Sequence, residues 1–300
     1  MGNAVLFPGQ GSQHVGMGAD AYENSPAARA IFERADVLLG FPLSQLCFQG
    51  PEDQLIDTVY QQPALLTTSI AYWHAMLEMG WSTPDFMAGH SLGEFSALVA
   101  AGSLTFEDGL ALVRKRGELM KMAGELAPGG MIAILALDVI TGQELCQKAS
   151  EESGFPVQLA NDNCPGQIVI SGHETALQEA IRLADEAGAR KIVRLPISIA
   201  AHSILMAPAA EEFAKTVDAT PIGAPQAPVI GNVSALPLNT ADDIRNEIKS
   251  QLTSTVAWTD SMRYLLTHEI STFIESGPGK VLLGLVKRID RKSNRIGFEI

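Results

Sequence analysis

The stretch Gly89-His90-Ser91-Leu92-Gly93 decides how this chain is interpreted. It follows a short apolar run that begins at Asp85, and it opens a run of small and apolar residues that ends near Ala101. Strand, Gly-x-Ser-x-Gly turn and helix in this order are typical of a nucleophile elbow, which holds a serine hydroxyl clear of the backbone. The glycines permit the tight turn, and the free N–H groups at the helix start favour an oxyanion. The stretch therefore predicts that Ser91 forms an ester; the alternative is a Gly/Ser turn without chemistry.

The composition indicates a globular protein with a large core. Of the 300 residues, 46% are apolar and 18% are charged, and no window offers the ~18 uncharged apolar residues that a membrane span needs. The N-terminus lacks the basic segment of a signal peptide. The three cysteines have neither metal-ligand nor disulfide-framework spacing, so we expect a cytoplasmic protein without a metal site. The net charge of −13 argues against nucleic acid as a partner.

The pattern of apolar runs predicts two units. Residues 1–126 and 198–300 alternate short apolar runs with helical periodicity, which is typical of a parallel sheet covered by helices. Residues 127–197 have the order β-α-β-β-α-β, in which two strands at 157–160 and 167–172 are joined by a turn-rich segment. We therefore expect an α/β fold, with an α/β-hydrolase-like main domain and an inserted ferredoxin-like subdomain. The junction between them is a favoured place for a ligand cleft.

A serine nucleophile needs a base, and the chain has six histidines. His90 is adjacent to Ser91, but adjacent side chains at an elbow point in different directions. His202 follows Pro196-Ile197-Ser198-Ile199-Ala200-Ala201, where the chain returns from the insert to the main domain. A junction loop can bring this histidine over the elbow, although by its position alone it is equally well a structural residue. The other four fall in predicted helices or loops: His14, His74, His173 and His268.

A set of motifs spread over nearly the whole chain points to a known family. In order, they are Phe7-Pro-Gly-Gln-Gly-Ser-Gln13, Gly89-His-Ser-Leu-Gly-Glu94, Arg114-Lys-Arg-Gly117, Asn163-Cys-Pro-Gly-Gln167, Ala201-His-Ser203, Gly231-Asn-Val233, Gln251-Leu252 and Glu275-Ser-Gly-Pro-Gly-Lys280. With them the chain resembles the malonyl-CoA:acyl carrier protein transacylases and the related acyltransferase domains of polyketide synthases. The first motif lacks the final glycine of Gly-x-Gly-x-x-Gly, so it is not a dinucleotide-binding loop.

The resemblance implies a role for each site residue. Ser91 would carry the acyl group, His202 would be its base, and a backbone carbonyl near Gln251 would hold the imidazole in place of an aspartate. The backbone N–H groups of Gln10 and Leu92 would form the oxyanion hole. The resemblance also implies a monomer that transfers malonyl from malonyl-CoA to the phosphopantetheine thiol of acyl carrier protein by ping-pong exchange. No cofactor is expected besides the coenzyme A thioester itself.

Arg116 is the residue on which the resemblance places substrate selection. A planar guanidinium can clamp the free carboxylate of a malonyl group through two charge-assisted hydrogen bonds. Without the family match, Arg116 is an exposed arginine on a helix surface next to Arg114 and Lys115.

The residue before the predicted base departs from the family pattern. Malonyl-selective relatives often carry phenylalanine or serine there, whereas this chain has Ala201. A smaller residue leaves room beside the acyl α-carbon, so a polyketide acyltransferase that takes methylmalonyl or another carboxyacyl group is the alternative substrate assignment. An acyl-thioester hydrolase with the same dyad and a catalytically idle carrier-binding module are the alternative functions. The fatty acid and polyketide pathways are not separated by these residues.

Basic clusters supply candidates for docking an acidic carrier protein, because the chain as a whole is acidic. One lies in the segment 287–295 and the other comprises Arg190, Lys191 and Arg194. Either cluster can equally be a solvated basic surface.

Overall fold

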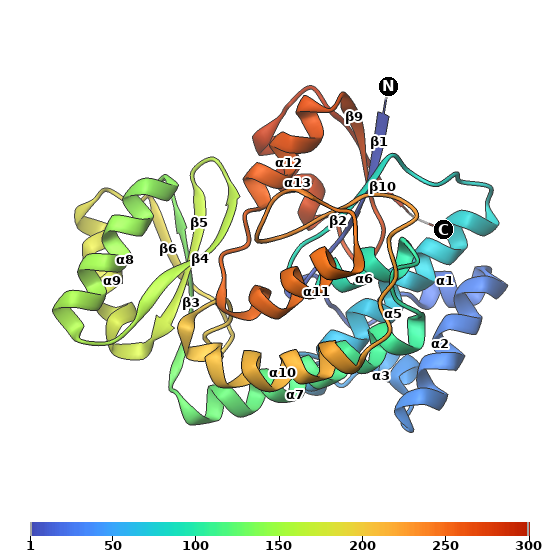
Figure 1. Cartoon of the computed structure of the whole chain (residues 1–300), viewed down its shortest axis with the longest axis horizontal. Coiled ribbons are helices and arrows are strands. Elements are labelled where there is room, and N and C mark those ends of the chain that lie inside the picture. Colours follow the sequence, from blue (N-terminus) through green and yellow to red (C-terminus); the bar gives the residue numbers. More distant parts are fainter. Residues whose placement is uncertain (1, 299) are drawn as a thin grey trace.

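The computed structural model describes residues 2–298 and 300, and it is a mixed α/β structure with two sheets (Figure 1). Among these residues, six strands form the larger sheet in the order β10-β9-β1-β2-β7-β8, parallel except for the antiparallel β8. The strands are β1 (Gly2–Phe7), β2 (Phe86–Gly89), β7 (Val229–Ile230), β8 (Pro237–Leu238), β9 (Ile270–Glu275) and β10 (Asn294–Gly297).

Both faces of this sheet are buried, as β1 shows. Val5 and Phe7 pack into one apolar cluster and Ala4 and Leu6 into another, because side chains alternate along a strand. The first cluster is covered by α1 (Ala19–Asn24), α2 (Pro26–Leu39), α3 (Leu43–Gln49), α4 (Glu52–Leu55), α5 (Thr58–Glu78), α6 (Leu92–Ala100), α7 (Phe106–Leu126), α10 (Ala207–Ala219) and α11 (Ala241–Ser250). The second is covered by α12 (Trp258–Thr267) and α13 (Val281–Ile289). Two-sided burial explains why the strands are continuous apolar runs.

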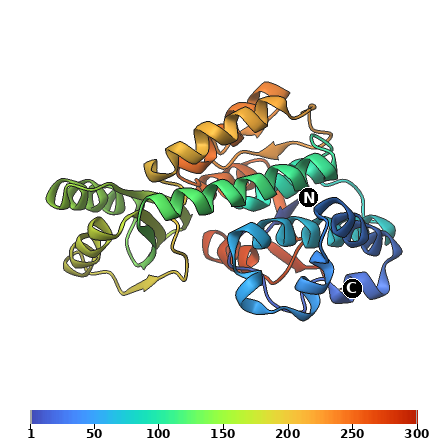
Figure 2. The same cartoon turned by 90° about the horizontal axis from the view of Figure 1, so that it is seen from below.

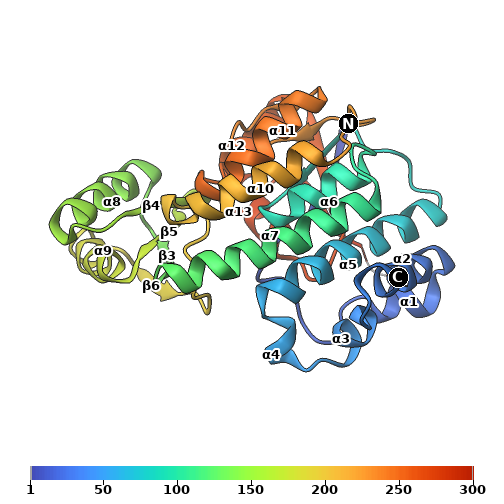
Figure 3. The same ribbon diagram turned by 60° about the horizontal axis from the view of Figure 1, so that its bottom comes forward.

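The segment after α7 forms a separate antiparallel sheet with its own apolar core. The strand order is β4-β5-β3-β6, and helices α8 (Val139–Ser153) and α9 (Glu174–Glu186) pack on it. Its strands are β3 (Gly129–Leu135), β4 (Val157–Cys164), β5 (Gln167–His173) and β6 (Lys191–Arg194). Helix α7 runs from the larger unit to this sheet, as Figures 2 and 3 show, and the chain returns through residues 195–203.

The structure corrects one local prediction. Residues 161–164 were predicted as part of a turn, but they continue β4 as a bulged strand. The reason is pairing on two sides. Asn161 and Asp162 lie opposite Val169 and Ile168 of β5. On the other side Asp162 N–H donates to the Val256 carbonyl and Val256 N–H donates to the Ala160 carbonyl, at 3.0 and 2.8 Å. The Asn-Asp-Asn sequence predicts a turn because asparagine and aspartate favour turns, and the residue types do not reveal the pairing. No helix in the described part of the chain is long and apolar enough to cross a membrane.

Candidate active site

Ser91 lies at a sharp turn between β2 and α6, with φ 52° and ψ −106°. The turn depends on glycine at both ends. A Cβ atom on Gly89 would lie 1.9 Å from the Gly93 carbonyl carbon, and one on Gly93 would lie 2.0 Å from the Phe7 carbonyl oxygen. Such contacts exclude a side chain at either position, so glycine at both positions lets α6 lie close to the sheet. The predicted strand-turn-helix is present.

His202 faces the nucleophile. Its Nε2 lies 2.8 Å from Ser91 Oγ, and its Nδ1 lies 2.9 Å from the main-chain carbonyl oxygen of Gln251. A carbonyl only accepts hydrogen bonds, so Nδ1 carries the proton and the Nε2 lone pair is directed at the serine hydroxyl. Burial lowers the pKa of His202 to about 3, and the nearby Arg116 cation contributes. The imidazole is therefore neutral, as a general base must be.

Arg116 lies on α7 and is fully buried beside the dyad, not on the helix surface. Its Nη2 donates to Ser91 Oγ at 3.2 Å and to Gln251 Oε1 at 2.8 Å, and its Nη1 donates to Gln62 Oε1 at 3.0 Å. Burial lowers its pKa to about 10, so the guanidinium is still a cation at neutral pH. Within residues 2–298 and 300 its Nε is buried and has no hydrogen-bond partner.

The backbone amides of Gln10 and Leu92 are adjacent and free. A Cβ on Gly9 would lie 2.2 Å from the His90 carbonyl and 3.7 Å from Leu92 N, so the loop after β1 is packed against the elbow. Neither amide donates to an acceptor among the residues that the structure describes. The Gln10 side chain holds the loop in place by donating to Thr58 Oγ1 at 3.2 Å and to the side-chain oxygen Oε1 of Gln61. Unpaired N–H groups beside a nucleophile are what an oxyanion requires.

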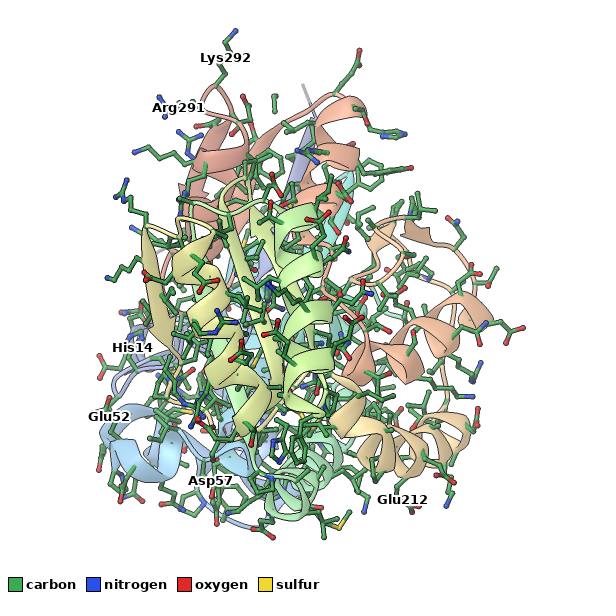
Figure 4. The ribbon with its side chains drawn as sticks, turned by 90° about the vertical axis from the view of Figure 1, so that its left-hand side faces the viewer. His14, Glu52, Asp57, Glu212, Arg291 and Lys292 are labelled. Carbon is green, nitrogen blue, oxygen red and sulfur yellow. The ribbon has the colours of Figure 1, made fainter. Side chains whose placement is uncertain are left out.

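A cavity of about 830 Å³ lies between the two units, and Gln10 is one of the residues that line it. Residues 194–199 line it on one side, and the lining on the other side includes Gln10, Gly11, Gln13, Ile56, Asp57, Thr58, Gln61 and Lys121. Asp57, which lines it and receives a salt bridge from Lys121, is labelled in Figure 4. Arg194, one of the candidate docking cations, also lines it but is paired with Glu174 at 2.5 Å.

The comparisons with known proteins agree with this geometry. The family model for the acyl transferase domain matches residues 5–295.

The chain belongs to the acyl transferase family.

This acyl transferase is 49% identical over 293 residues to the malonyl CoA-acyl carrier protein transacylase of Bacillus subtilis (strain 168), which covers 98% of this chain and 92% of that relative. The solved transacylase of Coxiella burnetii is 40% identical, with a TM-score of 0.96 over 99% of this chain and 93% of that one. A malonyl-transacylase solved with its type II PKS acyl-carrier protein is 38% identical, with a TM-score of 0.95 over 99% and 96% of the two chains. The predicted resemblance is confirmed.

The acyl transferase site contains residues that the sequence interpretation missed. Asn232 Oδ1 accepts from Ser91 N–H at 2.6 Å, and Asn232 Nδ2 donates to the Gly89 carbonyl at 2.7 Å, so this side chain holds both ends of the turn. Its motif, Gly231-Asn-Val233, was recognised without a role. Glu94 likewise belongs to a recognised motif but was given no role. Gln62 was missed, because it lies in a helical run where nothing in the sequence marks a polar residue as buried.

The remaining histidines lie away from the nucleophile. His90 points from the elbow toward Asn163 of the smaller unit, with Nε2 2.8 Å from Asn163 Oδ1, and its ring packs on Trp258. The sequence prediction that His90 is badly directed to act as the base is thus confirmed. His173, predicted in a loop, ends β5 and caps α9.

Proposed function

We propose that this acyl transferase moves a malonyl group from malonyl-CoA to the phosphopantetheine thiol of acyl carrier protein through an ester on Ser91. The observation that carries the proposal is a buried guanidinium 3.2 Å from the nucleophilic oxygen of a serine–histidine pair. The names of the relatives agree with it, and they favour neither a hydrolase nor an idle carrier-binding module. The partners that we assign are therefore acyl carrier protein and malonyl-CoA.

The first half-reaction acylates the serine. His202 Nε2 takes the proton of Ser91, and Oγ attacks the thioester carbonyl carbon. The resulting oxyanion accepts from the N–H groups of Gln10 and Leu92, which have no other acceptor among the described residues. The tetrahedral intermediate collapses, the carbon–sulfur bond breaks, and the imidazolium gives its proton to the coenzyme A thiolate. Thioester, ester and thioester are close in energy, so the exchange needs no metal or redox cofactor.

The second half-reaction reverses these roles. The carrier thiol gives its proton to His202, attacks the ester carbonyl, and leaves as the malonyl thioester while Ser91 recovers its proton. Because the same dyad serves both halves, the two thiols must reach Oγ by the same route. We assign that route to the cavity between the units, which Gln10 lines. Its walls also limit the water that would otherwise hydrolyse the ester.

Selection of the acyl group would come from Arg116. A carboxylate held by a guanidinium this close to Oγ can be separated from the ester carbon by only a short chain, which suits a three-carbon diacid. Ala201 is buried beside His202 and leaves room at the α-carbon, so methylmalonyl is the competing substrate. Gln251 would serve this site in two ways, through its carbonyl on His202 and its side chain on Arg116.

We further propose that residues 1–126 and 198–300 form an α/β-hydrolase-like domain and residues 127–197 a ferredoxin-like subdomain. The elbow between β2 and α6 supports the first assignment, and the strand order β4-β5-β3-β6 with its separate core supports the second. A cytoplasmic monomer remains our proposal for location and assembly.

The test is intact-protein mass spectrometry after brief mixing with malonyl-CoA, methylmalonyl-CoA and acetyl-CoA in competition, followed by phosphopantetheinylated carrier protein. We expect a malonyl adduct that disappears as loaded carrier appears. An adduct that decays to free acid without loading the carrier would instead identify a hydrolase. Absence of any adduct would overturn the covalent mechanism.

A further inference from the structure

Glu94 is a fully buried carboxylate next to the active site that the mechanism above does not use. It lies in the first turn of α6, three residues after the nucleophile, and it touches none of the reacting atoms. A carboxylate is costly to bury unless donors and a counter-charge surround it. The hydrogen-bond donors and charges around Glu94 therefore indicate its role.

Both oxygens of Glu94 accept hydrogen bonds from residues that hold the catalytic groups. Oε1 accepts from the main-chain N–H of Asn232 at 2.9 Å, and Oε2 accepts from the side-chain amide of Gln251. The two donors differ in one respect. The Asn232 N–H can only donate, whereas the Gln251 amide can present either its NH₂ or its oxygen, depending on which way it is turned.

The orientation of the Gln251 amide decides what Arg116 meets. With its NH₂ on Glu94 and on the Ser91 carbonyl (3.0 Å), Gln251 directs Oε1 at Arg116 Nη2, 2.8 Å away. Together with Gln62 Oε1, this oxygen holds the guanidinium in place beside Ser91. Turned the other way, the amide would direct two N–H donors at a cation.

Charge supports the same arrangement. Glu94 and Arg116 lie on either side of the Gln251 amide, and each favours the charged form of the other. The other carboxyl facing this cluster is Glu247, which accepts from the N–H groups of Val233 and Ser234. Burial raises the pKa of Glu94, Glu247 raises it further, and the two hydrogen bonds and Arg116 oppose that rise.

We propose that Glu94 is the positioning residue that turns the Gln251 amide oxygen toward Arg116, and that it thereby makes the site selective for acyl groups bearing a carboxylate. The inference rests on the proposed function, because it assumes that Arg116 binds the acyl carboxylate. Glu94 acts through Gln251 and not on the substrate.

The variant Glu94→Gln separates this role from simple packing. Glutamine has the same shape, but only one of its two terminal atoms accepts. The Asn232 N–H retains that acceptor, so the new NH₂ faces the Gln251 amide, which must turn over to offer its oxygen. Its own NH₂ then opposes Arg116 and displaces the guanidinium. The hydrogen bond of His202 Nδ1 is unaffected, because its acceptor is the main-chain carbonyl of Gln251 and not the side chain.

Two rates measured on Ser91 report the two parts of the site. One is acylation by malonyl-CoA, and the other is labelling by an uncharged fluorophosphonate, which needs the dyad but no carboxylate clamp; both are followed by quenched-flow mass spectrometry. For Glu94→Gln we expect malonyl loading to fall about 30- to 100-fold, as for one misaligned charge-assisted contact, and labelling to change less than about threefold.

Two further variants keep the test decisive. Glu275→Gln is the matched control, because Glu275 is also fully buried and accepts from two main-chain N–H groups, those of Leu282 and Leu283. It should leave the ratio of the two rates unchanged. Glu94→Asp keeps two acceptor oxygens, so it should preserve the ratio even if both rates fall, and it serves if Glu94→Gln does not fold.

The inference is overturned if Glu94→Gln loses malonyl loading and labelling equally, or loses neither. It is also overturned if the ratio of malonyl loading to labelling is as low in Glu94→Asp as in Glu94→Gln. Failure of the proposed function is a different result, in which the unmodified chain itself loads no malonyl. In that case the loading rates with methylmalonyl-CoA and succinyl-CoA, measured in parallel, replace the malonyl rate in the ratio of loading to labelling.

Discussion

Replacing Arg116 by leucine removes the guanidinium while leaving most of the buried side-chain volume. If Arg116 donates two charge-assisted hydrogen bonds to the acyl carboxylate, each contributes about 1.5–3 kcal/mol, so the barrier for malonyl transfer rises by roughly 3–6 kcal/mol. At 1.36 kcal/mol per factor of ten, kcat/KM for malonyl-CoA falls about 10²- to 10⁴-fold. Acetyl-CoA makes neither contact, so its kcat/KM should stay within about tenfold of its original value.

The assay is Ser91 acylation by each thioester, with circular dichroism and thermal melts to confirm folding. Removing one member of a buried polar network costs about 3–5 kcal/mol of stability, so the melting temperature should fall. Arg114→Leu is the control, since Arg114 lies two residues away, is partly exposed and pairs with Glu118. A folded Arg116→Leu protein that still prefers malonyl-CoA over acetyl-CoA would refute the carboxylate clamp.

Three other outcomes follow from the same geometry. Ser91→Ala should form no acyl adduct by mass spectrometry, and a carrier still loaded by that variant would contradict the covalent route. The pKa of His202 is lowered to about 3, chiefly by burial, so the base is neutral at any pH above that value. The rate of fluorophosphonate labelling of Ser91 should therefore not change from pH 5 to 8. A labelling rate that falls below a pH of about 6.5 would show that His202 titrates normally. Gly93→Ala should lower the free energy of unfolding by about 3 kcal/mol or more in denaturant titrations, since the new Cβ would lie 2.0 Å from the Phe7 carbonyl oxygen. Gly284→Ala is the control: it has open space around it and should raise the free energy of unfolding by about 0.5–1 kcal/mol. Equal effects of the two substitutions would contradict the packing account.

Local sequence patterns predicted the parts of this protein that depend on neighbouring residues. Strand, turn and helix around Ser91 follow from glycine spacing and from the apolar runs on either side, and those features act within about ten residues. The division into a parallel-sheet unit and an antiparallel insert also follows from the order of apolar runs. The family resemblance then supplied candidates for the base, the amides and the clamp, since its motifs lie in order along the chain.

Contacts between distant segments decided the rest. Nothing in the sequence around Glu94, Gln62 or Asn232 indicates that these polar side chains are buried, because each is buried by helices and loops from elsewhere in the chain. The turn-like 161–164 segment is a strand that pairs with β5, and it also bonds to residue 256, which lies far along the chain. The direction of the Gln251 amide likewise depends on partners 135 to 160 residues away. The sequence by itself determined which residues could carry the chemistry, whereas only the tertiary structure decided how they are oriented, since hydrogen-bond direction and burial arise when remote segments pack together.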